Sequence, residues 1–149
     1  MNNLIKMYYD FTMNNVLWKL KTKKKFKIDT NYCDIHKECF IPNSTKFQHK
    51  GLGIVIGRGV KLGENVTVFQ NVTIGGSGKR LVEPECKDNG YSVIEDNVIL
   101  LSGCGIFGPI TIGHDSIIGA GSVVLNNIPP YSLVVGVPGK VIKNLKVIK

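Results

Sequence analysis

An aliphatic residue returns every six positions through most of this chain. Two runs keep the step, and their ten aliphatic positions are Ile56, Leu62, Val68, Ile74, Ile94, Leu100, Ile106, Ile112, Ile118 and Val124. Four positions after eight of them comes a small or β-branched residue, namely Val60, Val66, Val72, Val98, Cys104, Ile110, Ser116 and Ser122. A helix has a period of 3.6 residues and a strand a period of 2, so neither element alone produces this pattern. Two coupled positions over so many steps indicate a repeat architecture.

Such a repeat predicts an all-β fold, a parallel β-helix. Each hexad forms one short strand and one tight corner, and three hexads complete a triangular coil of about 18 residues. The aliphatic residues point inwards and stack on their equivalents in neighbouring coils, because no coil can bury its apolar face alone. Glycine and asparagine at the corners permit unusual backbone angles.

The period breaks twice. From Phe47 to Ile56 the step is nine residues, so three residues are inserted around the segment "HKGLG". From Ile74 to Ile94 it is twenty, and the sequence between them is polar and charged and contains a proline. We therefore predict a loop extruded from the coil over about residues 77–92. A regular solenoid needs no such loop, so it carries either function or a tolerated surface insertion.

Both ends of the chain differ from the repeat. Residues 1–30 are predicted to form an N-terminal helical segment with one mainly apolar face, and six lysines follow between Lys19 and Lys27. This segment either packs on its own domain or a neighbouring subunit, or makes peripheral contact with an anionic membrane. Residues 31–128 form the predicted β-helix. Residues 129–149 begin with two prolines and are predicted to cap the open end of the coil.

Composition limits the function further. The formal net charge of +8 favours anionic ligands, phosphorylated cofactors included. The four cysteines have no metal-binding spacing, which favours reduced thiols and a cytoplasmic location. No apolar run is long enough to span a bilayer, and the N-terminus lacks the order of a signal peptide. Basic and aromatic residues are not interleaved, so nucleic-acid binding is not expected.

Two long stretches carry a family resemblance. "GIVIGRGVKLGENVTVFQNVTIGGSGK" and "IGAGSVVLNNIPPYSLVVGVPGKVI" resemble the left-handed β-helix, hexapeptide-repeat acyltransferases. Within that family the chain is most similar to the serine acetyltransferase branch and its relatives that acetylate surface polysaccharides, from about Asp34 to Lys143. The resemblance implies a left-handed coil, acetyl-CoA as co-substrate, no metal, and a cyclic homotrimer with active sites at subunit junctions.

The resemblance also implies a catalytic pair. His49, just before "GIVIG", matches the general base, and Asp34 in "CDIH" matches the carboxylate that orients it. Histidine titrates near neutral pH and can take the proton of a hydroxyl that attacks a thioester. A carboxylate on the other ring nitrogen fixes its tautomer. His36 and His114 lie elsewhere in the hexads, and the three histidines lack the spacing of the zinc site in a γ-type carbonic anhydrase.

For acetyl-CoA, the resemblance implicates small residues beside which the pantetheine arm approaches the backbone, and a lysine for its phosphates. These residues are Ser102, Gly103, Ala120, Gly121 and Lys140. A backbone N–H in the turn that contains Gly76 is the expected donor to the oxyanion of the tetrahedral intermediate.

Two departures from the serine acetyltransferase pattern bear on the acceptor. Gln48 stands where that branch has an aspartate, and Gly90 and Tyr91 stand where it has an arginine–histidine pair. Both changes remove a charged partner of a zwitterionic amino acid. We therefore expect Gln48 and Tyr91 to bind a neutral sugar of a surface glycan or its precursor, and free serine to be a poor acceptor. Serine O-acetylation is the alternative, and a non-catalytic β-helix scaffold is a further one.

Overall fold

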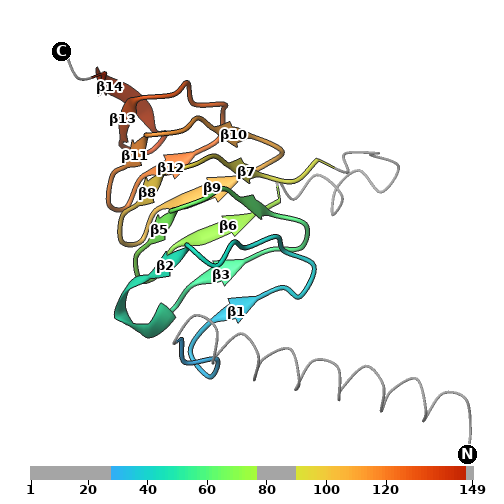
Figure 1. Cartoon of the computed structure of the whole chain (residues 1–149). Helices are drawn as coiled ribbons and strands as arrows, with labels where there is room; N and C mark the ends of the chain where they lie inside the picture. The colour runs from blue at the N-terminus through green and yellow to red at the C-terminus, as the bar shows by residue number, and fades with distance from the viewer. Residues whose placement is uncertain (1–27, 77–89, 147–149) are drawn as a thin grey trace, which may run out of the picture.

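Short strands wind into a three-sided prism along the chain (Figure 1). The structure, a computed structural model, describes residues 28–76 and 90–146. Three sheets form the sides, with the strand orders β1-β3-β6-β9-β12, β10-β7-β4 and β14-β13-β11-β8-β5-β2, which we name sheets A, B and C. The predicted left-handed parallel β-helix is confirmed.

Almost every strand is only two or three residues long. Sheet A contains β1 (Asp34–Ile35), β3 (Val55–Ile56), β6 (Thr73–Gly75), β9 (Gly105–Phe107) and β12 (Val123–Val124). Sheet B contains β4 (Lys61–Leu62), β7 (Val93–Ile94) and β10 (Thr111–Ile112). Sheet C contains β2 (Lys46–Phe47), β5 (Thr67–Val68), β8 (Ile99–Leu100), β11 (Ile117–Ile118), β13 (Ser132–Val135) and β14 (Lys140–Asn144). A 3-10 turn, η1 (Gln48–Gly51), follows β2.

The six-residue period becomes the register of the sheets. In sheet A, Ile35 pairs with Ile56, Ile56 with Ile74, Ile74 with Ile106, and Ile106 with Val124. All ten aliphatic positions of the repeat are at most 2% exposed, and the eight residues four positions later are at most 7% exposed. Burying one such aliphatic side chain stabilises the fold by about 1.5–3 kcal/mol. The core is therefore a continuous stack along the prism axis.

Asparagine and aspartate suit the corner between sheets B and C, where the backbone turns through positive φ. Asn65, Asn97 and Asp115 have φ values of 57°, 59° and 57°. Their side chains also bridge consecutive coils, since Asn65 donates to Asn97 (3.4 Å) and Asn97 donates to Asp115 (3.1 Å). Asn and Asp tolerate this backbone region better than other side chains.

An antiparallel hairpin ends the prism. β13 adds to β11 in parallel, and β14 returns along β13 in the opposite direction. β14 is the outer strand of sheet C, and its Lys140 and Lys143 are exposed. Lysines on an edge strand discourage pairing with other chains.

Parts of the predicted organisation fall outside the described residues. The helical segment and its lysines (1–27), most of the extruded loop (77–89) and the last residues (147–149) belong to this group, so the domain limits stay predictions. The same holds for the predicted membrane contact of Lys19 to Lys27. Within residues 28–76 and 90–146, no helix has the length and apolar character needed to cross a bilayer.

Candidate active site

One edge of the prism gathers most of the predicted site residues. We call it the C–A corner, because there the chain passes from sheet C to sheet A, in the turns 48–54, 69–72, 101–104 and 119–122. The turns stack through backbone hydrogen bonds. The N–H of Asn71 donates to the Leu52 carbonyl (2.8 Å), that of Gly103 to Gln70 (3.0 Å) and that of Gly121 to Ser102 (2.9 Å).

His49 lies at the N-terminal end of this corner, in η1. It has φ 49° and ψ 38°, and Lys50 has φ 57° and ψ 23°, so two consecutive non-glycine residues occupy the left-handed region. Such a conformation costs about 1–3 kcal/mol per residue and persists only where the surroundings impose it. Strained backbone of this kind is concentrated at functional sites.

The surroundings of η1 do impose this conformation. The N–H of Asp29 donates to the Lys50 carbonyl (2.8 Å), and that of Gly53 donates to the Tyr32 carbonyl (2.7 Å). Gly51 is buried, and a Cβ added to it would lie 3.1 Å from Ile28 Cγ2. The three inserted residues thus form a protrusion that is fastened to the coil below it.

The His49 side chain is exposed and lies beside one aromatic ring. The centroid of the Phe69 ring is 6.4 Å from that of the imidazole, with an interplanar angle of 52°. In the described part of the chain the imidazole makes no hydrogen bond, so both ring nitrogens are available to a substrate and to an orienting group. An exposed imidazole outside the core can serve as a general base.

Asp34 approaches the same corner from sheet A. It begins β1, its carboxylate is exposed, and its N–H donates to the Ile54 carbonyl (2.8 Å). No hydrogen bond or ion pair among the described residues joins its carboxylate to His49. Catalytic hydrogen bonds often form only in the substrate complex. The structure brings the two residues to one corner without contact, and the orienting role of Asp34 stays a prediction.

Small residues continue the corner beyond His49. Gly103, Ala120 and Gly121 are exposed and Ser102 is half-buried. A Cβ on Gly121 would meet nothing within 4 Å, and one on Gly103 would meet only the Gly121 nitrogen at 4.0 Å. The backbone is therefore open along this edge, and an extended ligand can approach it closely.

Lys140 lies at the far end of the same corner. The turn before it stacks on the last corner turn, since the N–H of Val123 donates to Gly136 (3.0 Å) and that of Gly139 donates to Val123 (2.7 Å). The base and the predicted phosphate-binding lysine therefore mark the two ends of one edge. With adjacent strands about 4.8 Å apart, four coil steps separate these ends by about 19 Å.

Gly76 and Tyr91 lie at a different corner, where the chain passes from sheet A to sheet B. Gly76 is exposed, and a Cβ added to it would meet no described atom within 4 Å. The Tyr91 ring covers Gly59, where an added Cβ would lie 2.5 Å from the ring. Gln48, by contrast, is half-buried next to His49 in η1. The single chain therefore brings Gln48 to the base but not Tyr91 or Gly76.

Two cysteines, the buried Cys104 and the half-buried Cys39, are poor nucleophiles. Burial raises the pKa of the Cys104 thiol to about 12 and that of the Cys39 thiol to about 11. The Cys39 thiol also donates to the Gly57 carbonyl (3.0 Å). Because the thiolate is the reactive form, neither group can carry an acyl intermediate near neutral pH.

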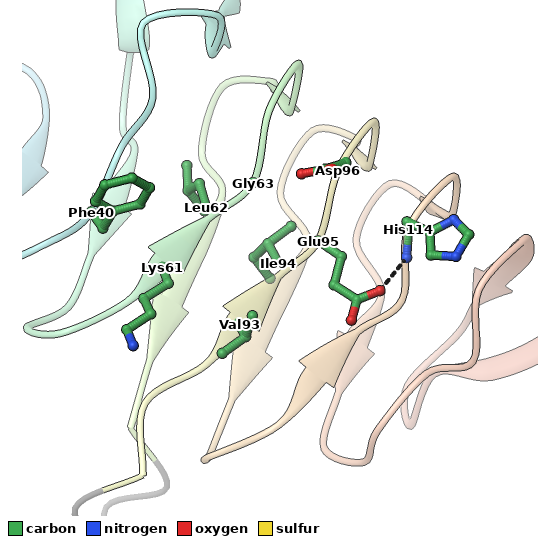
Figure 2. Close-up of a pocket in the computed structure, with 9 residues that line it drawn as sticks. All are labelled: Phe40, Lys61, Leu62, Gly63, Val93, Ile94, Glu95, Asp96 and His114. Atoms are coloured by element: carbon green, nitrogen blue, oxygen red, sulfur yellow. Dashed lines mark hydrogen bonds between the residues drawn. The ribbon is translucent and has the colours of Figure 1, made fainter.

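A groove of about 500 Å³ lies on the outer face of sheet B, away from the C–A corner (Figure 2). Its lining residues are Phe40, Lys61, Leu62, Gly63, Val93, Ile94, Glu95, Asp96 and His114. Its carboxylates are engaged by the backbone, since His114 N–H donates to Glu95 (2.8 Å) and Glu64 N–H to Asp96 (2.8 Å). Across the described ranges no group of three or more His, Cys, Asp or Glu could hold a metal ion.

Comparison with known proteins identifies the repeat. Residues 91–126 match the family model described as bacterial transferase hexapeptide (six repeats). A serine acetyltransferase of Buchnera aphidicola subsp. Schizaphis graminum is 37% identical over 142 residues, covering 91% of this chain and 52% of that protein. The chain therefore spans about half the length of this curated relative.

Solved structures of serine acetyltransferases also resemble this chain. A soybean serine acetyltransferase complexed with serine has a TM-score of 0.66 and 35% identity, covering 74% of this chain and 43% of that one. A serine acetyltransferase in complex with CoA has a TM-score of 0.63 and 32% identity, covering 74% of this chain and 41% of that one.

These relatives overturn the predicted glycan acceptor. That expectation, and the related one that free serine is a poor acceptor, relied on two neutral residues, Gln48 and Tyr91. The relatives reported above are serine acetyltransferases, which favours the alternative. The reasoning failed because two neutral residues show only that two particular charges are missing, and not that the site lacks a charged partner for serine.

Proposed function

Since this chain is a hexapeptide-repeat protein of the serine acetyltransferase-like branch, we propose that it transfers the acetyl group of acetyl-CoA to the hydroxyl of L-serine. The observation that carries this proposal is the C–A corner. It holds an exposed histidine at one end, open backbone along its length and a lysine at the other end. The related solved structures with serine and with CoA support the two substrates.

His49 is the proposed general base. As the serine oxygen attacks the thioester carbonyl, the imidazole takes the hydroxyl proton and a C–O bond forms. The tetrahedral intermediate then expels the thiolate of CoA, which recovers the proton from the imidazolium, and the C–S bond is broken. Proton transfer of this kind contributes about 10²–10⁴-fold to the rate. Asp34 is the proposed orienting carboxylate, from the same corner.

The corner suits the donor substrate. Ser102, Gly103, Ala120 and Gly121 are the proposed contacts of the pantetheine arm, because they leave the backbone accessible. Lys140 is the proposed phosphate contact, in a chain whose formal net charge is +8. The raised pKa values of the Cys39 and Cys104 thiols are consistent with direct transfer, because neither thiol is a good nucleophile near neutral pH.

The positions of the two corners support the proposal of a homotrimer. Gly76, the proposed oxyanion donor, lies at the A–B corner, away from His49 in the same chain. Only a neighbouring copy could bring an A–B corner next to a C–A corner. We therefore propose that each active site forms between two subunits, as closed cyclic assembly permits.

A spectrophotometric assay tests the proposed reaction. Purified chain, acetyl-CoA and L-serine should release free CoA thiol, detected with Ellman's reagent, and mass spectrometry should identify O-acetylserine. The matched controls omit serine or replace it with neutral sugars, which should give only the background rate. The proposed function would be overturned if the protein assembles and binds acetyl-CoA but releases no thiol in response to serine.

A further inference from the structure

Free serine carries a carboxylate that needs a partner in the site. The position before the base is neutral Gln48, and Tyr91 packs over Gly59 at the other corner. A carboxylate that leaves water without a charged or hydrogen-bonded partner is strongly disfavoured. If serine is the acceptor, as proposed above, a cation must therefore lie elsewhere within reach of the base.

The chemistry of serine limits where that cation can be. The hydroxyl and the carboxylate are borne by adjacent carbons of one small molecule, so a hydroxyl held at His49 places the carboxylate close to the imidazole. Any residue that binds it must belong to the immediate surroundings of η1 rather than to the distant end of the corner.

Lys50 meets this requirement. It follows His49 directly, so the two Cα atoms are about 3.8 Å apart. Its carbonyl accepts the Asp29 N–H (2.8 Å), and its φ of 57° is part of the same fixed protrusion. The side chain is exposed, and its ammonium has no ion pair within the described ranges. A flexible four-carbon stem lets that ammonium reach a small ligand at the neighbouring imidazole.

Within one chain, other described cations fit less well. Arg58 pairs with Glu38 (3.5 Å), and Lys61 lines the groove on sheet B. Lys46 lies in β2, before η1, with its backbone paired to Thr67 on the side of sheet C. Lys140 is at the far end of the corner. Lys50 is the one that the fold fastens beside the base.

We propose that Lys50 is a specificity-determining residue, whose ammonium binds the carboxylate of the amino-acid acceptor while His49 receives its hydroxyl proton. Lys50 would thus supply the positive charge that Gln48 and Tyr91 lack, from the same turn as His49. This inference rests on the proposed function and makes a separate claim about one residue.

Kinetics of Lys50→Met test the claim, because methionine keeps an unbranched stem and loses the charge. The KM for L-serine should rise about tenfold or more, the usual value of a hydrogen bond to a charged group. The KM for acetyl-CoA should stay within about twofold. Lys50→Arg should retain most of the affinity for serine, and Lys46→Met, the matched control on the preceding strand, should behave as wild type.

L-Serinamide, in which an amide replaces the carboxylate, separates charge recognition from a structural role. A purely structural role of Lys50 would leave the preference for serine over serinamide unchanged. The wild type should prefer serine to serinamide, and Lys50→Met should lose most of that preference. Thermal unfolding and gel filtration confirm that the variant is folded and assembled. If the wild type acetylates serine, and Lys50→Met has the same KM for serine and the same preference for serine over serinamide, the role of Lys50 is overturned and the proposed function stays intact. A wild type that does not acetylate serine would overturn both.

Discussion

Gly51 is the glycine that allows the His49 protrusion to rest on the coil below, and Gly51→Ala tests this directly. Its φ of 78° is unfavourable for a residue with a Cβ, at a cost of about 1–2 kcal/mol. The added Cβ would also lie 3.1 Å from Ile28 Cγ2 and 3.2 Å from Ile28 Cβ. Ile28 is 2% exposed and β-branched, so it cannot easily move away, and overpacking of this kind costs about 1–3 kcal/mol.

The expected sum is a loss of about 2–5 kcal/mol in the free energy of unfolding. For a chain of this length, 1 kcal/mol corresponds to a shift of roughly 2–4 °C in Tm, so Gly51→Ala should lower Tm by roughly 4–20 °C. The protrusion should also shift, so the variant should lose kcat with serine while acetyl-CoA binding is kept. Differential scanning calorimetry and the thiol-release assay measure the two effects.

Gly121→Ala is the matched control for stability. Gly121 has a similar φ of 67°, but a Cβ there would meet nothing within 4 Å. It should therefore cost only the backbone contribution of about 1–2 kcal/mol. If Gly51→Ala is no more destabilising than Gly121→Ala, the contact with Ile28 does not constrain the protrusion and the reasoning is refuted.

Two further predictions concern charge states and orientation. Burial raises the pKa values of the Cys39 and Cys104 thiols, so both thiols stay protonated below about pH 10. Iodoacetamide at pH 8 should therefore label them only after the protein is unfolded in urea. Rapid labelling of either thiol in the native protein, measured by peptide mass spectrometry, would contradict the described burial. Asp34→Asn should lower kcat with serine by less than removal of the base does, because it disturbs the orientation of His49 without deleting it, and equal losses in the two variants would show that Asp34 does more than orient.

The coil could be predicted from the sequence because its period maps directly onto burial. A residue such as Leu100 or Ile106 must point inwards once every third of a coil, and each is 0% exposed. The same counting predicts that a nine-residue step from Phe47 to Ile56 interrupts the coil. It identifies where His49 leaves the core, because an insertion cannot remain in a stack of fixed spacing.

The conformation of the insertion could not be predicted. Consecutive left-handed residues at His49 and Lys50 depend on backbone hydrogen bonds from Asp29 and Gly53, and no local preference of histidine or lysine favours them. The position of Tyr91 over Gly59 depends likewise on a contact between residues far apart in the chain. The groove on sheet B had no sequence signal, since side chains from several coils line it.

The acceptor was predicted wrongly for a related reason. Neutral side chains at two positions show that two particular charges are missing, but they do not show that the site lacks charge. Lys50 illustrates the difference, because it is a cation one residue from the proposed base and lies outside the two positions that the family pattern singles out.

The most direct test of the C–A corner as an active site is the turnover of His49→Ala with L-serine and acetyl-CoA. His49 is exposed and contributes nothing to the stacked core, so the variant should keep its fold, its assembly and its acetyl-CoA binding. Its kcat should fall by about 10²–10⁴-fold relative to the wild type. A folded, assembled His49→Ala protein that retains most of the wild-type kcat would show that the base lies elsewhere and would contradict the account.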